Sequence, residues 1–147
     1  MKTTILLGLL LCLVFSTGCR GGKAPPMKAG PLIETYAAEA AQNQLVAGEK
    51  QDIEITVRYQ RSQPSAAKLK YKVQFSAPSD LTVTPKDWDV EQNLTANDAG
   101  FNYTGLISIE VAADATAGER EVTATIIPAQ GATTTATLRF QVPKKGG

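Results

Sequence analysis

Residues Leu106–Pro128 read LISIEVAADATAGEREVTATIIP, and their pattern limits what the rest of the chain can form. The first and last parts of this stretch alternate apolar and polar residues, which is typical of half-buried β-strands because successive side chains point to opposite faces. Asp114 and Gly118, which lie between the two parts, are turn-forming residues. We therefore expect two strands joined by a corner, with these side chains facing the core: Ile107, Ile109, Val111, Val122, Ala124 and Ile126.

The same alternation occurs on both sides of this corner and predicts three more strands. One of them also places three lysines, Lys68, Lys70 and Lys72, on its outer face. The expected core residues of the three strands are Ile53, Ile55, Val57 and Tyr59, then Leu69, Tyr71, Val73 and Phe75, and finally Ala136, Leu138, Phe140 and Val142.

Between these strands the chain carries a short strand and several turns. We expect the short strand at Leu81–Thr84, and after Pro85 the parity reverses because Trp88 and Val90 become the apolar positions. Such a reversal indicates a bend or a bulge. Polar residues and turn formers predict loops at Arg61–Ala66, Glu91–Gly100 and Ala129–Ala132.

The first part of the body permits two interpretations. Residues 32–47 fit a first strand split into Leu32–Ala37 and Leu45–Val46, but the segment TYAAEAAQNQL also contains good helix formers and fits a short helix. Together with the strands that follow, the body would contain seven or eight short strands, with no internal repeat. The sequence therefore predicts an all-β fold, an antiparallel β-sandwich.

The first 19 residues, MKTTILLGLLLCLVFSTGC, have the pattern of a secretory signal. Lys2 precedes an apolar run from Ile5 to Phe15, and small residues follow it up to Cys19. The run is shorter than the roughly 20 apolar residues that a membrane-spanning helix needs. We expect this segment to be removed.

The tetrapeptide Ser16–Cys19 resembles the bacterial lipobox, although Ser16 stands where leucine is commoner. The resemblance implies cleavage before Cys19 and acylation of its sulfur, which would anchor the protein to a membrane. Arg20 is not aspartate, and in enteric-type lipoproteins this favours the outer membrane. Ordinary cleavage, which would leave a soluble periplasmic protein, is the alternative. The expected parts are a signal peptide (1–18), a lipidated cysteine with a flexible tether (19–30), a sandwich (31–143) and a disordered basic tail (144–147).

The charges are distributed unevenly along the chain. Residues 31–142 hold 9 basic and 14 acidic side chains, a net of −5, whereas the tether and the tail are basic. A mildly acidic body argues against nucleic acid as a partner, and a basic tether suits an anionic membrane surface. After cleavage only Cys19 remains of the two cysteines, so no disulfide can form within the mature chain.

Three segments resemble the immunoglobulin-like or fibronectin-III-like modules of bacterial envelope proteins, and especially those found beside secreted glycosidases. They are the turn AGEK (47–50), the segment LTVTP (81–85) and VAADATAGEREVTATI (111–126). The resemblance implies the fold and no catalytic residues. It also implies that the three predicted loops lie at the end where the first strand begins, with the corner Ala112–Glu119 and Lys144 at the other end.

The available side chains argue against an enzyme. The chain has no histidine, an acylated Cys19 would leave no thiol, and no serine lies in a GxSxG elbow. Asp87, Asp89 and Glu91 alternate along one segment, but three carboxylates supply too few oxygens for calcium. We expect no metal and no cofactor.

The candidate binding residues each have a structural and a functional interpretation. Trp88 suits the core by its alternation with Val90, or it stacks on a sugar together with Tyr36 and Phe101. The three lysines either hold an anionic polymer or solvate the outer face and discourage edge pairing. Near the membrane, a partner would find Arg61, Asn97 and Asp98. The sequence thus favours a membrane-anchored envelope lipoprotein that acts as a non-catalytic structural or protein-interaction module, with a carbohydrate-binding module as the alternative.

Overall fold

The computed structural model describes residues 30–146. The predictions for the signal segment, for Cys19 and for most of the tether lie outside these residues. Every described strand lies in the second of two units, Leu32–Gly147. No helix in residues 30–146 is both long enough and apolar enough to cross a membrane.

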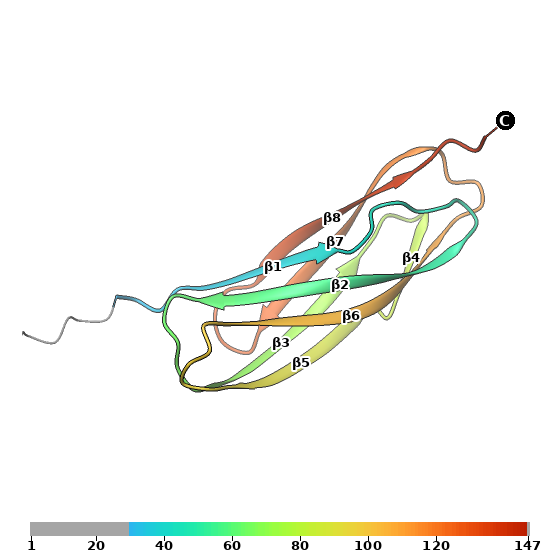
Figure 1. The fold of residues 1–147 in the computed structure, drawn as a ribbon. Helices are drawn as coiled ribbons and strands as arrows, with labels where there is room; N and C mark the ends of the chain where they lie inside the picture. Colours follow the sequence, from blue (N-terminus) through green and yellow to red (C-terminus); the bar gives the residue numbers. More distant parts are fainter. Residues whose placement is uncertain (1–29, 147) are drawn as a thin grey trace, which may run out of the picture. The chain divides into compact units, whose positions relative to one another are not determined.

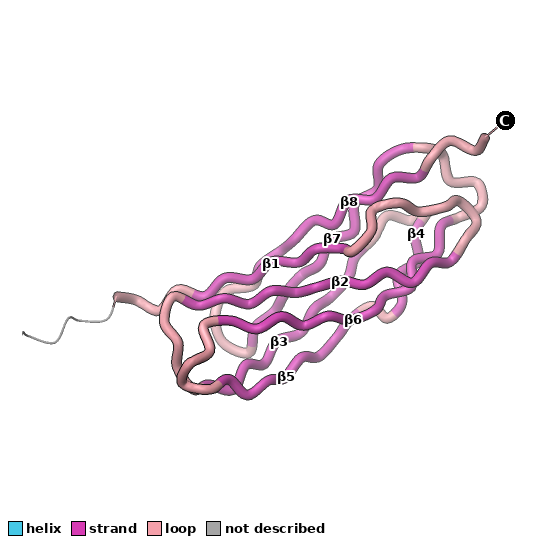
Figure 2. Tube along the Cα trace, viewed as in Figure 1, coloured by secondary structure: helices cyan, strands magenta, loops and turns pink. Residues whose placement is uncertain are grey.

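The second unit is a sandwich of two four-stranded antiparallel sheets (Figure 1). Sheet A has the order β1-β2-β6-β4, and sheet B has the order β5-β3-β7-β8. The strands are β1 (Glu34–Ala40), β2 (Lys50–Arg61), β3 (Ala67–Ser76), β4 (Leu81–Thr84), β5 (Asp87–Leu94), β6 (Gly100–Val111), β7 (Gly118–Pro128) and β8 (Thr134–Val142). Only loops and turns connect them in Figure 2, so the all-β prediction is confirmed.

The core lies between the inner faces of the two sheets. All the residues expected to face it from β2, β3, β6 and β7 are buried, and in β8 only Ala136 is half-buried. Period-2 alternation succeeds here because each sheet has one solvated face, so every second side chain loses its contact with water. Burial of these side chains is the main force that holds the sheets together.

The first strand is split between the two sheets, and the helix interpretation is wrong. β1 pairs with β2 in sheet A, and the chain then crosses to sheet B, where Leu45 N donates to Gln141 O (2.9 Å). Leu45 is fully buried there. The segment contains good helix formers, but it forms a strand because Tyr36, Ala38 and Ala40 pack against the core at alternate positions. Tertiary packing of these side chains outweighs helix propensity.

The reversal of parity after Pro85 marks a change of sheet. β4 belongs to sheet A and β5 to sheet B, and the Thr84–Pro85 peptide bond between them is cis. Phe75 N donates to Lys86 O (2.8 Å), which fixes the crossing chain to β3. The predicted bend is therefore present. The change of sheet leaves β4 only four residues long.

Several loop boundaries were wrong: Arg61 still belongs to β2, and Gly100 already begins β6. Residues Glu91–Leu94, predicted as part of a loop, extend β5 and pair with Lys70 through Ala67 of β3. Gln92 and Leu94 continue the inward parity of Val90, and Leu94 is buried. The sequence of Glu91–Leu94 was interpreted as a loop because most of its residues are polar. These polar residues include the outer face of the strand, and only its inner face is apolar.

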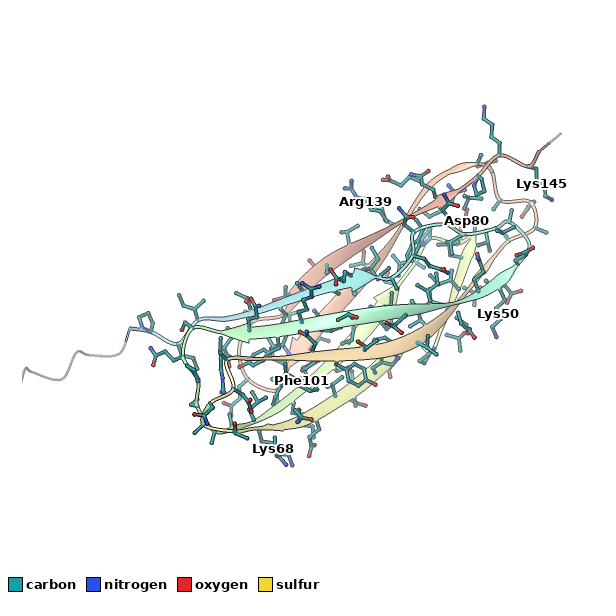
Figure 3. All side chains as sticks on the ribbon, viewed as in Figure 1. Lys50, Lys68, Asp80, Phe101, Arg139 and Lys145 are labelled. Atoms are coloured by element: carbon teal, nitrogen blue, oxygen red, sulfur yellow. The ribbon has the colours of Figure 1, made fainter. Side chains whose placement is uncertain are left out.

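The loops gather at the two ends of the sandwich as expected. Glu34 pairs with Arg61 and Gln60 with Gly100, so the loops 62–66, 95–99 and 129–133 share the end where β1 begins, which we call the loop end. The opposite end, the corner end, holds residues 112–117. There the tail residue Lys145 donates through Nζ to Ala113 O (3.5 Å; labelled in Figure 3).

Candidate functional site

Arg61 joins two loops at the loop end. Its parity follows Val57 and Tyr59, so the side chain turns inward and is only 6% exposed. Nε and Nη2 donate to Asp98 O (3.0 and 2.7 Å), Nη1 donates to Ser65 Oγ (3.1 Å), and Nη2 also donates to Ser65 O. The guanidinium thus ties loop 62–66 to loop 95–99. It is occupied within the protein rather than presented to a partner near the membrane.

The other two residues predicted there differ in accessibility. Asp98 Oδ2 accepts a hydrogen bond from Thr95 N (2.6 Å), which closes the turn. Hydrogen bonds from Thr95 hold the pKa of the Asp98 carboxyl below its usual range, and Arg61 contributes in the same direction. Asn97 is exposed at the tip of this turn. Of the three predicted residues, Asn97 alone presents its side chain freely to solvent.

Three tyrosines pack together beneath the loop end. The ring of Tyr36 lies 5.0 Å from that of Tyr59 and 5.5 Å from that of Tyr71, measured between centroids. Tyr59 Oη donates to Glu34 Oε1 (2.5 Å). Burial raises the pKa of Tyr36 to about 12 and raises the pKa values of the other two phenols further. All three phenols therefore stay neutral at physiological pH and cannot serve as general bases.

A cavity of about 360 Å³ opens beside this cluster, between β1 and the loops of the opposite sheet. Its lining includes Leu32, Glu34, Tyr36, Ser65 and Gln130. The mixture of an aromatic ring, a carboxylate and amide and hydroxyl groups can hold a polar chain end or a small polar ligand. Sequence analysis missed this cavity, although the inward parity of Tyr36 and Tyr59 was a usable signal.

The three lysines lie on the outer face of sheet B, where Lys68 projects into solvent (Figure 3). Each faces a carboxylate across the strand pair: Lys68 and Lys70 reach Glu91 (2.5 and 4.0 Å), and Lys72 reaches Asp89 (3.6 Å). Lys68 holds the pKa of the Glu91 carboxyl below its usual range. Edge protection was the wrong explanation for them, because β3 lies between β5 and β7. Their positive charge is locally balanced, which leaves a weaker attraction for an anionic polymer.

Trp88 stands at the margin of the core. Its ring packs edge-on against Phe75 (4.8 Å between centroids) and Tyr103 (5.6 Å), and a Cβ at Gly105 would lie only 2.9 Å from the indole. The side chain is half-buried, so it belongs to the rim of the core and offers no free platform. In residues 30–146 no aromatic side chain is fully exposed. Stacking on a sugar would therefore require rearrangement.

The acidic trio does not converge. Asp87, Asp89 and Glu91 stand along the outer face of β5, where two of them face lysines. Among the described residues no three acidic, histidine or cysteine side chains gather closely enough to hold a metal ion.

The corner end has its own arginine clamp. Arg120 Nε donates to Asp80 Oδ2 (2.6 Å) and Nη2 donates to Thr116 O (2.9 Å). The clamp ties the corner to the turn before β4. Arg120 thus fixes the corner to the body of the sandwich.

The comparisons with known proteins give a fold and no family. No protein-family model and no curated protein sequence matches the chain. Among solved structures, the periplasmic chaperone SfaE is similar over 76% of this chain and 58% of its own, at 14% identity and a TM-score of 0.53. The α-2-macroglobulin of E. coli is similar over 79% of this chain but only 7% of its own, at 17% identity and a TM-score of 0.52.

These likenesses define the class of the protein. It is an immunoglobulin-like β-sandwich, as the sequence predicted. At such identities the likeness concerns the fold alone, and the chain spans little more than half of the chaperone. Function must be argued from the features of this chain.

Proposed function

We propose that the protein is a lipid-anchored envelope protein whose sandwich acts as a non-catalytic interaction module. One observation carries the proposal. Ile33 N donates to Ser62 Oγ (2.9 Å) and Ser62 N donates to Ile33 O (2.8 Å), which fastens the start of the body to the loop end. The segment that carries the lipobox-like Ser16–Cys19 therefore joins the sandwich at one defined end.

The length of the connecting segment then gives the sandwich an orientation. Arg20–Leu32 contains 13 residues, which span at most about 44 Å and as a flexible coil average about 20 Å. Acylated Cys19 would thus hold the loop end nearer the membrane and turn the corner end away from it. The exposed Leu32 (53%) and Ile33 (59%) lie on the membrane side in this arrangement.

The interaction role follows from what this body can offer a partner. Its two ends are held rigid by the Arg61 and Arg120 clamps, and rigid loops suit recognition. The resemblance to a periplasmic chaperone supports an envelope setting and a protein partner. No observation favours the carbohydrate alternative: Trp88 packs against Phe75 and Tyr103, and Tyr36 packs against Tyr59 and Tyr71. Phe101 is half-buried against the core.

Mass spectrometry of the mature protein tests the anchor. We expect an N-terminus at Cys19 that carries acyl chains, and we expect Cys19→Ser to release the protein from the membrane fraction. We further expect the acylated protein to fractionate with the outer membrane. An unmodified N-terminus away from Cys19 would refute the anchor.

The orientation is tested by protecting single cysteines with liposomes. Asn97 at the loop end and Asp114 at the corner end are both exposed. With the acylated protein on anionic liposomes, Asn97→Cys should react with a water-soluble maleimide more slowly than Asp114→Cys. Equal rates, or slower reaction at Asp114→Cys, would refute the orientation. Protein without liposomes provides the reference rates.

A further inference from the structure

Among residues 30–146, no strand pairs with β6 along more than half of one of its sides. It pairs with β2 from Gly100 to Glu110, but on its other side β4 covers only Ser108–Val111. Figure 1 shows β4 beside only the far part of β6, because the chain leaves sheet A at Pro85. On this side of sheet A, residues Phe101–Ile107 therefore form an unpaired edge, which we call the open edge.

The direction of the backbone groups can be deduced from the hydrogen bonds at the two ends of β6. Arg61 N donates to Ala99 O and Val111 N donates to Glu49 O, so odd-numbered residues of this segment bond to the β2 side. Ala112 N donates to Asp80 O, on the β4 side. Because the direction alternates along an antiparallel strand, the N–H and C=O groups of Asn102, Thr104 and Leu106 point out of the open edge.

The open edge lacks the charges that guard the other edges of the sandwich. The edge strand β5 carries Asp87, Asp89 and Glu91, and the edge strand β1 carries Glu34 and Glu39. The edge strand β8 carries Arg139 and is partly covered by Leu45, whose N–H donates to Gln141 O. Phe101–Ile107, FNYTGLI, has no charged residue and no proline. Native proteins protect exposed edges with charge or proline, so an unprotected edge is expected to be covered in use.

The side chains around this edge are partly exposed apolar groups. Where β4 covers β6, Ile109 and Val111 are buried, whereas Phe101 and Tyr103 stay half-buried and Trp88 packs beside Tyr103. On the outer face Leu106 is 61% exposed. A strand laid along the edge would cover these side chains from both faces of the sheet.

We propose that the open edge of β6 binds an extended, uncharged segment of a partner protein as an added strand that continues the line of β4. The segment pairs with Phe101–Ile107 and carries apolar side chains at alternate positions, toward Trp88 and Tyr103. Ladder hydrogen bonds to Asn102, Thr104 and Leu106 supply affinity, and the apolar side chains supply selectivity. Because Phe101–Ile107 has no charged side chain, it offers no ion-pair partner to a charged segment.

A second copy of this chain fits the edge less well. Antiparallel pairing of two β6 edges about a two-fold axis would turn the two loop ends in opposite directions, whereas two acylated tethers must reach one membrane. This choice of occupant rests on the proposed function, but the strand-addition site itself does not.

Binding of a synthetic peptide to the full chain in detergent tests the site without requiring acylation. The probe is a fluorescent, uncharged peptide, acetyl-SNVTVTVNS-amide, and its control has proline in place of the central valine. The key variant is Thr104→Pro, which removes an N–H at the open edge and leaves the β2 ladder intact. Thr104→Val is the matched control, because it loses only the hydroxyl that faces Thr56 (3.0 Å).

We expect the probe to bind and the Thr104→Pro variant to bind it at least tenfold more weakly, while Thr104→Val binds as the parent does. Amide exchange provides a measurement on the unaltered chain: the amides of Asn102 and Thr104 should exchange quickly alone and slowly with the probe. Equal binding by Thr104→Pro, or no binding of the probe, would overturn the site. Amide protection that rises with protein concentration alone would overturn the partner in favour of a second copy. Acylation of Cys19 without probe binding would remove this inference and leave the proposed function standing.

Discussion

Replacement of Arg61 by methionine should loosen the loop end and lower stability substantially. Methionine keeps the length of the buried stem but removes every donor to Asp98 O, Ser65 O and Ser65 Oγ. A hydrogen bond that involves a charged group contributes about 1.5–3 kcal/mol, and the loop carbonyls regain part of this from water. We therefore expect a loss of about 3 kcal/mol. For a body of this size it lowers Tm by roughly 12 °C.

Thermal and urea unfolding, followed by far-UV circular dichroism, measure the loss. The matched control is Arg58→Met, three residues earlier on the same strand, where the guanidinium is exposed and pairs only with Glu39. That pair should contribute less than about 0.5 kcal/mol because water screens it. A Tm of Arg61→Met within about 3 °C of the parent, or equal losses in the two variants, would show that the clamp is not what stabilises the loops.

Two further predictions concern the rim of the core and the outer face. Gly105→Ala places a Cβ about 2.9 Å from the indole of Trp88, so the ring must turn outward. We expect this to destabilise the fold by about 1–2 kcal/mol and to shift the fluorescence emission of this single tryptophan to the red. An unchanged emission spectrum would contradict the packing. Glu91 has a pKa that Lys68 lowers from 4.5, so its stabilising effect is present above pH 4.5 and is lost as the pH falls through the folded pKa. The parent should therefore lose its stability advantage over Glu91→Gln as the pH falls, which urea unfolding at several pH values can measure. A difference in the free energy of unfolding that stays constant with pH would argue against the Lys68–Glu91 pair.

Alternation along single strands was predictable because burial acts on each strand locally. The faces of Ile53–Tyr59 and Leu69–Phe75 follow from one apolar contact surface per sheet, whatever strand lies beside them. Arg61 could have been found in the same way, since it continues the parity of Tyr59. It was assigned to the loop because a charged residue after an apolar run resembles a boundary.

Pairing between distant strands could not be read from the sequence. The lysines of β3 have the composition of an edge, and only the pairing of β3 with β5 on one side and with β7 on the other reveals a central strand. Likewise, the reversal of parity at Pro85 is equally compatible with a bulge and with a change of sheet. Whether β3 is an edge or a central strand, and whether the chain bulges or changes sheet at Pro85, depends on which strands pair in three dimensions. The local sequence pattern carries no information about this pairing.

The crossing of the first strand between sheets also sets how the body resists force. β1 runs from the loop end toward the corner end and makes seven residue pairs with β2, and the chain then continues along β8 at Gln44. A pull on Leu32 away from the body acts along the strand axis, so these pairs are loaded together in shear and cannot peel open one by one. The contacts of Gln44 and Leu45 with β8 in sheet B also oppose the sliding of β1. A pull at the loop end is thus resisted by all seven β1–β2 residue pairs at once.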